Sequence, residues 1–167
     1  LYKSSNVGAA KVGLKLGPER LYHYITSFGF GAPSGILLPG ESRGALRPVA
    51  RWETLSVTRL SMGHELLVTP LQMVMAVAAI ANEGRLMLPL LVDRLQDDEG
   101  RVVWKNQPTR VRQAISPAAA RQAVAAMKAV ATQEGTAPKA KLEHFTVAGK
   151  TGTAQKCING TYDSGRY

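Results

Sequence analysis

The sequence predicts a mixed α+β fold in which a helical lobe lies beside antiparallel strands. Three observations favour this class. Short helices with clear start and stop signals follow one another near the amino terminus, an acidic turn joins two apolar runs in mid-chain, and alternating apolar residues precede residue 149. With 167 residues and 45% hydrophobic content, the chain can bury a core, so a disordered or collagen-like chain is excluded.

Two short helices are predicted first. Residues 6–16 form a helix that stops at Gly17, and Pro18 opens the next one, which ends at Gly29. Apolar side chains of the second helix recur at the spacing of one buried face: Leu21, Tyr24, Ile25 and Phe28.

The clearest helix is predicted over residues 70–83. Thr69 is a good N-cap, Gln72 completes a capping box, and Gly84 supplies the stop. Because residues 74–81 are apolar nearly all round, we expect this helix to be buried.

A later helix begins at Ser116 and is predicted to continue until Gly135. Its apolar residues share one face: Ala120, Val124, Met127 and Ala131.

Extended structure is predicted in three places. Residues 36–38 form a short extended piece within a loop rich in glycine and proline. Residues 91–96 and 101–105 form a hairpin around an acidic tip. Residues 145–148 form a strand that runs on into residues 149–153.

The charge and the metal-binding residue types exclude several function classes. The net charge is +9, but Lys and Arg are spread along the chain without a dense block, so nucleic-acid binding is not expected. The single cysteine, Cys157, cannot form an intrachain disulfide. Nothing around it indicates a reactive thiolate, and it is interpreted as a residue without a chemical role, at the rim of the strand expected to carry the site. We predict no cofactor. We also predict no metal site, because one cysteine and three histidines far apart do not make a Cys/His zinc cluster: His23, His64 and His144.

Two tripeptides carry a chemical signal: Ser4-Ser5-Asn6 and Lys150-Thr151-Gly152, which match the S-x-N and K-T-G motifs of penicillin-binding proteins and serine β-lactamases. A Ser4 hydroxyl held beside ammonium groups can pass a proton to a leaving amine. Asn6 offers an amide donor and acceptor to a peptide group, and Lys150 favours a substrate that carries a carboxylate.

The second motif also suits an exposed strand edge to which substrate adds as a further strand. Gly152 permits close approach, and the Thr153 backbone N–H is suited to donate to a developing oxyanion. The alternative is a capped helix and a Lys-Thr-Gly turn with no catalytic role.

Six segments, in this order, resemble the transpeptidase domain of class B penicillin-binding proteins: residues 4–8, 16–21, 28–31, 35–41, 68–72 and 147–155. Residues 47–48 and 52–56 resemble the cell-division subfamily slightly more than the elongation subfamily. The resemblance implies a bacterial D,D-transpeptidase that cross-links peptidoglycan stem peptides ending in D-Ala-D-Ala and is acylated by β-lactams. Ser4 and Lys150 would then assist proton transfer. Asn6, Thr151, Gly152 and Thr153 would bind the stem peptide, and the Thr153 N–H would form half of the oxyanion hole.

The resemblance also implies a location and partners. The protein would act on the outer, periplasmic face of the cytoplasmic membrane, anchored by an N-terminal segment. A membrane glycosyltransferase and the division or elongation machinery would be its protein partners.

The chain departs from the family pattern in two ways. No serine has a lysine three positions later, so the acylating serine is missing and is expected upstream of Leu1. Together with closing strands and a helix expected beyond Tyr167, this makes residues 1–167 a partial domain that is predicted to be inactive alone. Glu65 stands where many relatives have glycine, which leaves the local loop conformation open; it could equally be a solvated loop residue.

Two other functions remain open. One is a hydrolase, either a D,D-carboxypeptidase or a β-lactamase, although the separation of the motifs, 150 − 6 = 144 positions, argues against a compact β-lactamase. The other is a non-catalytic β-lactam sensor or scaffold, which turnover would distinguish from an enzyme.

Overall fold

The fold is described from a computed structural model, which covers residues 2–152, 156–158 and 161–163. It contains α-helices, short antiparallel strands and 3₁₀ turns, which confirms the α+β class. The helices are α1 (Asn6–Leu16), α2 (Pro18–Ser27), α3 (Ser56–Ser61), α4 (Pro70–Ala81) and α5 (Pro117–Lys128). The strands are β1 (Ala45–Leu46), β2 (Leu66–Leu67), β3 (Arg85–Met87), β4 (Arg94–Gln96), β5 (Val102–Lys105), β6 (Arg110–Gln113), β7 (Lys156–Ile158) and β8 (Thr161–Asp163), and the 3₁₀ turns are η1 (Val49–Arg51), η2 (Ala129–Ala131) and η3 (Pro138–Ala140).

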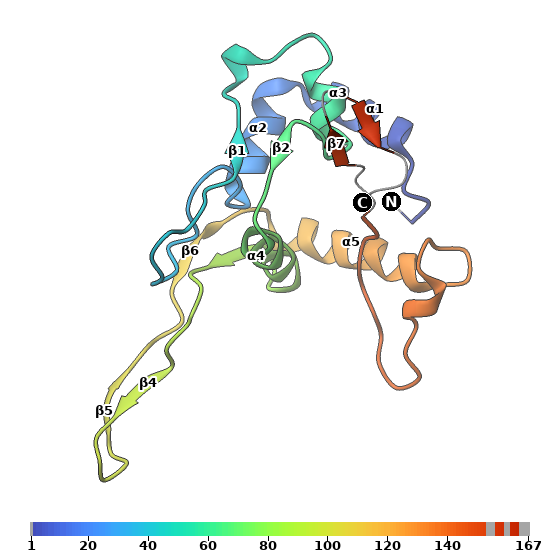
Figure 1. The fold of residues 1–167 in the computed structure, drawn as a ribbon. Coiled ribbons are helices and arrows are strands. Elements are labelled where there is room, and N and C mark those ends of the chain that lie inside the picture. Colours follow the sequence, from blue (N-terminus) through green and yellow to red (C-terminus); the bar gives the residue numbers. More distant parts are fainter. Residues whose placement is uncertain (1, 153–155, 159–160, 164–167) are drawn as a thin grey trace.

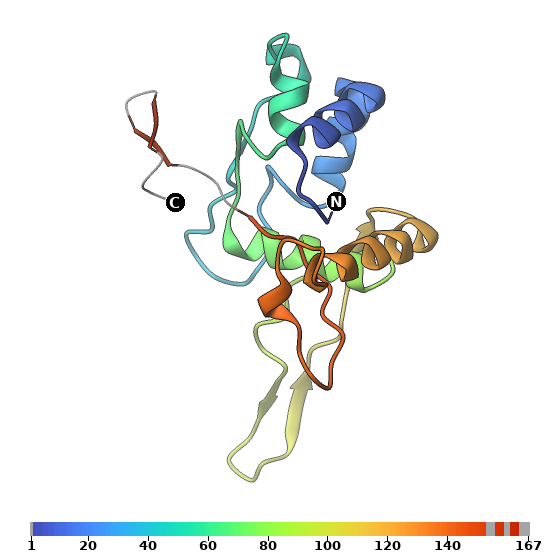
Figure 2. The same cartoon turned by 90° about the vertical axis from the view of Figure 1, so that its right-hand side faces the viewer.

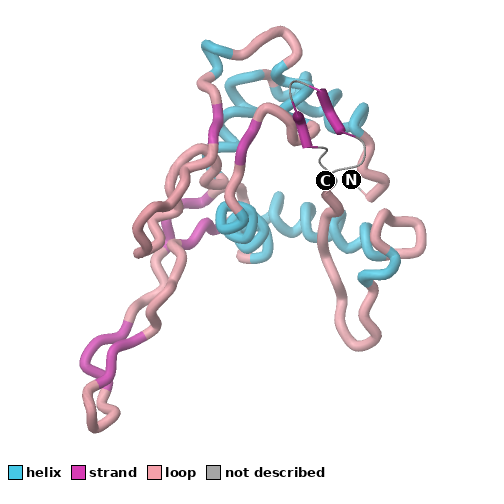
Figure 3. Tube along the Cα trace, viewed as in Figure 1, coloured by secondary structure: helices cyan, strands magenta, loops and turns pink. Residues whose placement is uncertain are grey.

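The helices form two groups (Figure 1). Helices α1, α2 and α3 lie together at one end of the molecule, and α4 and α5 pack against each other beyond them. A view turned by 90° shows the same division and also shows the 93–106 segment reaching away from the body (Figure 2). Strands are short, and loops make up much of the tube trace (Figure 3). Within the described residues no helix has the length and apolar character needed to cross a membrane.

The described strands form four antiparallel pairs rather than one continuous sheet: β1 with β2, β3 with β6, β4 with β5, and β7 with β8. The predicted hairpin is confirmed in β4 and β5, where Leu95 faces Trp104. At its acidic tip, Asp97 Oδ1 accepts hydrogen bonds from the backbone N–H groups of Glu99 and Arg101, at 3.1 and 2.8 Å. The tip is therefore held by its own residues.

The first two helices are confirmed with their predicted starts. Gly17 ends α1 with φ 78°, in the left-handed region that glycine adopts at little cost. The burial expected for Tyr24 is wrong, because its side chain is 41% exposed. Among the described residues it is Ser27 that α2 buries.

Helix α4 confirms the capping box, since Thr69 accepts from the Gln72 N–H and the Gln72 side chain accepts from the Thr69 N–H. The helix ends at Ala81 rather than at residue 83. Its predicted all-round burial is wrong: Val74 is 64% exposed, whereas Ala79 is only 1% exposed. The reason is that α5 and β3 pack on one face of α4, and no other described element covers the rest.

Gln72 ties α4 to the glycine-rich loop before it. Its side chain is 2% exposed, and its amide nitrogen donates to the carbonyl oxygens of Ala32 and Arg43 at 2.8 and 3.0 Å. Next to this contact, Gly44 (φ 66°) approaches β2 so closely that an added Cβ would lie 2.1 Å from the Leu67 carbonyl oxygen. The loop is thereby fixed against the start of α4.

Three further predictions about secondary structure are wrong. Residues 36–38 are not extended, because the Leu38 N–H donates to the Ile36 carbonyl and closes a tight turn. Helix α5 stops at Lys128 and tightens into η2 instead of continuing to residue 135. Residues 145–152 form no strand, since within the described chain no other strand pairs with them.

Candidate active site

The amino-terminal motif is built around the start of α1. Ser5 is the N-cap, and its Oγ accepts a hydrogen bond from the Gly8 N–H at 3.1 Å. Ser4, just before it, adopts φ 51°, an uncommon conformation for a residue other than glycine. The serine that caps the helix and the serine available for chemistry are therefore different residues. Asn6 is the first residue of α1 and is exposed.

The carboxy-terminal motif meets the first one in space. Lys150 Nζ donates to Ser4 Oγ at 2.7 Å, a contact between residues 146 positions apart. The same ammonium donates to the Thr151 carbonyl oxygen at 2.6 Å. Just before Lys150, the Gly149 N–H donates to the Met127 carbonyl at 3.2 Å, which attaches this segment to the end of α5.

A cavity of about 500 Å³ opens beside this contact. Ser4, Asn6 and Lys150 all line it, so three of the predicted site residues share one space. The rest of its wall is mostly apolar and comes from α1, α2 and the end of α3: Ser5, Gly8, Ala9, Val12, Gly13, Leu16, Leu21, Ser61 and Met62. The arrangement combines a cation, a hydroxyl and an amide at the edge of an apolar hollow, a composition that suits small-molecule or peptide ligands.

Helix α3 holds α1 in position behind this cavity. The two helices pack so closely that a Cβ on Gly13 would lie 1.9 Å from Ser61 Oγ. The Ser61 hydroxyl is occupied, because it donates to the Val57 carbonyl at 2.7 Å. Gly13 is therefore required for the spacing between the helix that carries Asn6 and the helix that backs it.

The other predicted residues have different outcomes. Thr151 is partly buried, and its Oγ1 lies 2.9 Å from Oγ1 of Thr136. Gly152 is exposed, and a Cβ there would meet nothing within 4 Å, so the backbone at this point is open to approach. Thr153 lies outside the described residues, and its part in an oxyanion hole stays a prediction.

Glu65 is not the solvated loop residue that the sequence left open. It has φ 58°, and its carboxylate is only 16% exposed. It accepts hydrogen bonds from Ser56 Oγ at 2.7 Å, from Arg59 at 3.0 Å and from Arg47. Partial burial acts to raise the pKa of Glu65, but these hydrogen bonds together outweigh burial and hold the pKa below its ordinary value.

The Glu65 cluster, made of Glu65 with Arg47, Ser56 and Arg59, was missed because its members lie 6, 9 and 18 positions from Glu65, which is no regular helical or strand spacing. Arg47 precedes η1, Arg59 lies on α3, and Glu65 follows α3. The only available signal was an acidic residue at a position where glycine is frequent. Ser56 and Arg59 both belong to α3, the helix that packs against α1, so the cluster lies on the helix behind the cavity.

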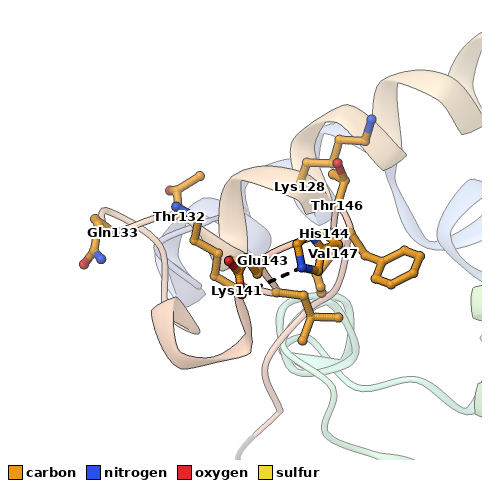
Figure 4. A pocket seen from close by; sticks show the side chains of 11 residues that line it. Lys128, Thr132, Gln133, Lys141, Glu143, His144, Thr146 and Val147 are labelled. Atoms are coloured by element: carbon orange, nitrogen blue, oxygen red, sulfur yellow. Dashed lines mark ion pairs between the residues drawn. The ribbon is translucent and has the colours of Figure 1, made fainter.

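A second cavity, of about 450 Å³, lies between the end of α5 and residues 141–147 (Figure 4). The dashed line in Figure 4 marks an ion pair between His144 and Glu143, at 3.9 Å. Both of these side chains are more than 80% exposed. Lys128 and Gln133 lie at opposite ends of this cavity in the figure. Its polar groups do not converge on a common point, so it resembles a surface hollow more than a chemical site.

Known proteins that are similar to this chain belong to one family. Residues 1–167 match the family model of the penicillin binding protein transpeptidase domain. The chain is 37% identical to penicillin-binding protein PbpB of Mycolicibacterium smegmatis over 92% of its length, and 39% identical to stage V sporulation protein D of Bacillus subtilis over 95%. These stretches make up 24% and 25% of the two relatives, so the chain spans about a quarter of their length.

Solved structures give the same result. Penicillin binding protein 3 of Mycobacterium tuberculosis, in complex with ampicillin, has a TM-score of 0.90 at 33% identity, covering 98% of this chain and 38% of that one. The transpeptidase domain of Burkholderia pseudomallei penicillin-binding protein 3 has a TM-score of 0.84 at 33% identity, covering 97% and 46%. The match of the family model to the whole sequence, together with these folds, shows that the chain belongs to the penicillin-binding protein transpeptidase domain family.

Proposed function

We propose that this chain is the part of a serine D,D-transpeptidase that carries the proton-transfer and substrate-binding motifs. The hydrogen bond from Lys150 Nζ to Ser4 Oγ, at 2.7 Å beside a cavity that Asn6 also lines, is the observation that carries the proposal. The acylating serine comes from a part of the protein outside these residues, because no serine here has a lysine three positions later.

The direction of the Lys150 to Ser4 hydrogen bond supports a proton relay. A lysine ammonium can only donate, so Ser4 Oγ is the acceptor and its own O–H is free to point elsewhere. When the nucleophilic serine adds to the carbonyl carbon of the D-Ala-D-Ala peptide bond, the C–N bond breaks and the leaving amine needs a proton. Ser4 donates that proton and regains one from the Lys150 ammonium. The proton of the nucleophile's own O–H goes to a base outside these residues and is returned to Lys150, so the step leaves the protonation of Ser4 and Lys150 unchanged.

The remaining residues serve recognition. Asn6 binds the peptide group of the donor stem, and Lys150 attracts its terminal carboxylate. The Thr151 hydroxyl binds the same carboxylate. The open backbone at Gly152 allows the main chain of the substrate to approach. The Thr153 N–H donates to the oxyanion. β-Lactams react here as analogues of the stem peptide.

The setting follows from the same proposal. The enzyme acts on peptidoglycan in the bacterial cell envelope, on the outer face of the cytoplasmic membrane, with a glycosyltransferase as its partner. The names of the relatives, which come from bacteria and include a sporulation protein and penicillin-binding proteins, support a class B enzyme of the division type.

The test is covalent labelling by a fluorescent penicillin, read by intact mass, on the full protein that contains this sequence. We expect one acyl adduct on the full protein. Lys150→Ala and Ser4→Ala should each slow acylation by about a hundredfold or more, the range for general acid–base groups. Lys105→Ala, on the β4–β5 hairpin away from the cavity, is the matched control and should react at the wild-type rate.

Three outcomes would count against the proposal. Absence of any adduct on the full protein would favour a scaffold. An adduct without transfer to an acceptor amine, but with turnover to hydrolysed product, would favour a carboxypeptidase or β-lactamase. Equal rates for Lys150→Ala and Lys105→Ala would remove Lys150 from the chemistry.

A further inference from the structure

Thr136 lies outside both sequence motifs but contacts one of them. It belongs to the loop between η2 and η3, and its Oγ1 is 2.9 Å from Oγ1 of Thr151. Either hydroxyl can be the donor in this pair. The contact joins the loop directly to the side chain proposed to bind the substrate carboxylate.

The backbone on both sides of Thr136 is fixed. The Ala137 N–H donates to the Val130 carbonyl at 2.9 Å, and the Gly135 N–H donates to the Thr132 carbonyl at 3.0 Å. Gly135 packs so closely that a Cβ would lie 2.1 Å from the Val130 oxygen, and Val130 itself is 2% exposed. Thr136 therefore projects from a loop that is attached to the core.

The partner hydroxyl is fixed as well. Residues 149–151 are held by the hydrogen bond of the Gly149 N–H to the Met127 carbonyl and by that of Lys150 Nζ to the Thr151 carbonyl. Because both threonines sit on restrained backbone, their hydroxyl–hydroxyl contact is a property of the fold rather than a chance meeting of two mobile side chains.

The chemistry of a carboxylate sets the direction of this contact. An ionised carboxylate only accepts hydrogen bonds, so a Thr151 hydroxyl that binds it must donate its single proton to it. The Thr151 oxygen then accepts from Thr136. A chain of hydroxyls in which each donates to the next polarises the last donor and strengthens its bond.

We propose that Thr136 is a positioning residue that donates to Thr151 Oγ1 and so directs the Thr151 proton to the carboxylate of the stem peptide or β-lactam. This inference rests on the proposed function, because it concerns recognition at the same site. Thr136 itself touches no substrate.

The test compares benzylpenicillin with its methyl ester on the full protein. The ester lacks the negative charge, so the ratio of the two acylation rate constants measures carboxylate recognition. Thr136→Val keeps the shape but removes the hydroxyl, and Thr136→Ser keeps the hydroxyl. Thr132→Val is the matched control, because Thr132 lies in the same loop but its hydroxyl, among the residues that the structure describes, bonds only to the Ala129 carbonyl.

We expect Thr136→Val to lower the acid-to-ester ratio about twofold, the effect of weakening the polarised Thr151–carboxylate hydrogen bond by about a fifth. Thr136→Ser and Thr132→Val should keep the wild-type ratio. Thr136→Ala, which also lacks the hydroxyl, gives the same measurement if the valine variant does not fold.

The experiment distinguishes a failure of the proposed function from a failure of the inference about Thr136. If wild-type protein is not acylated by benzylpenicillin, the proposed function fails. If wild-type protein is acylated but Thr136→Val slows acid and ester equally, Thr136 has only a structural role and this inference is overturned. A ratio that falls in Thr136→Ser as much as in Thr136→Val would also overturn it.

Discussion

Replacing Gln72 should cost far more stability than replacing an ordinary glutamine. Its side chain makes three hydrogen bonds of 3.0 Å or shorter: to the Ala32 and Arg43 carbonyls and from the Thr69 N–H. At about 1 kcal/mol for each, Gln72→Ala should lower the free energy of unfolding by about 3 kcal/mol. The loss includes the capping box of α4.

Gln96→Ala is the matched control. Gln96 donates one hydrogen bond, to the Gly100 carbonyl at 3.0 Å, and lies exposed on the β4–β5 hairpin. Its removal should cost less than about 1 kcal/mol. Urea unfolding of the full protein, followed by circular dichroism, gives both values, provided that the slope with denaturant is unchanged.

The variant Gln72→Glu gives a second test of the role of the Gln72 amide. A carboxylate cannot donate, so it would turn two bonds to carbonyl oxygens into repulsive contacts in a buried place. Burial raises the pKa of such a carboxyl, so Gln72→Glu should regain stability as the pH falls and the group becomes protonated. If Gln72→Ala loses no more stability than Gln96→Ala, or if Gln72→Glu matches wild type at pH 7, the reasoning about this amide is wrong.

Two further predictions use the same unfolding assay. Gly44→Ala should destabilise the protein by about 1–3 kcal/mol more than Gly40→Ala, because both glycines have positive φ but only at Gly44 would a Cβ meet a carbonyl oxygen, at 2.1 Å; equal losses would contradict the steric argument. Glu65 has a lowered pKa, so its advantage over Glu65→Gln should be full above the ordinary value of 4.5 and should vanish as the pH falls through the folded-state pKa. A stability difference that stays constant across the acid range would contradict the ion-pair account.

Helix starts could be predicted from the sequence because their signals are local. Thr69 and Gln72 are three residues apart, and Ser116 and Pro117 are adjacent. The residues that form each N-cap therefore lie within one helical turn of each other in the sequence. Predictions of helix ends and of side-chain burial are less accurate. Val74 is as apolar as any core residue, but its exposure depends on which elements pack around α4, and this is a tertiary property.

The sequence offers Ser4 and Lys150 as candidate site residues, but it does not show that they are in contact. Ser4 and Lys150 were found from two tripeptides, although nothing local to either motif measures the distance between them. The contacts of Thr136 and Glu65 are not predictable in this way, because Thr136 lies 15 positions from Thr151 and the partners of Glu65 lie 6, 9 and 18 positions from it, with no periodic pattern. The strand expected at residues 145–148 failed for a related reason: a strand exists only with a neighbour to pair with.

The hydrogen bond between Ser4 and Lys150 also has a consequence for folding kinetics. It closes a loop of 146 residues, whereas the helix caps and the β4–β5 hairpin close within a few positions. Contacts between distant residues form after local ones, because the chain must first lose the entropy of the whole intervening loop. We therefore expect the cavity beside α1 to assemble last. Reactivity towards penicillin would then mark the final folding step, so a pulse of label during refolding would count only molecules that have completed it.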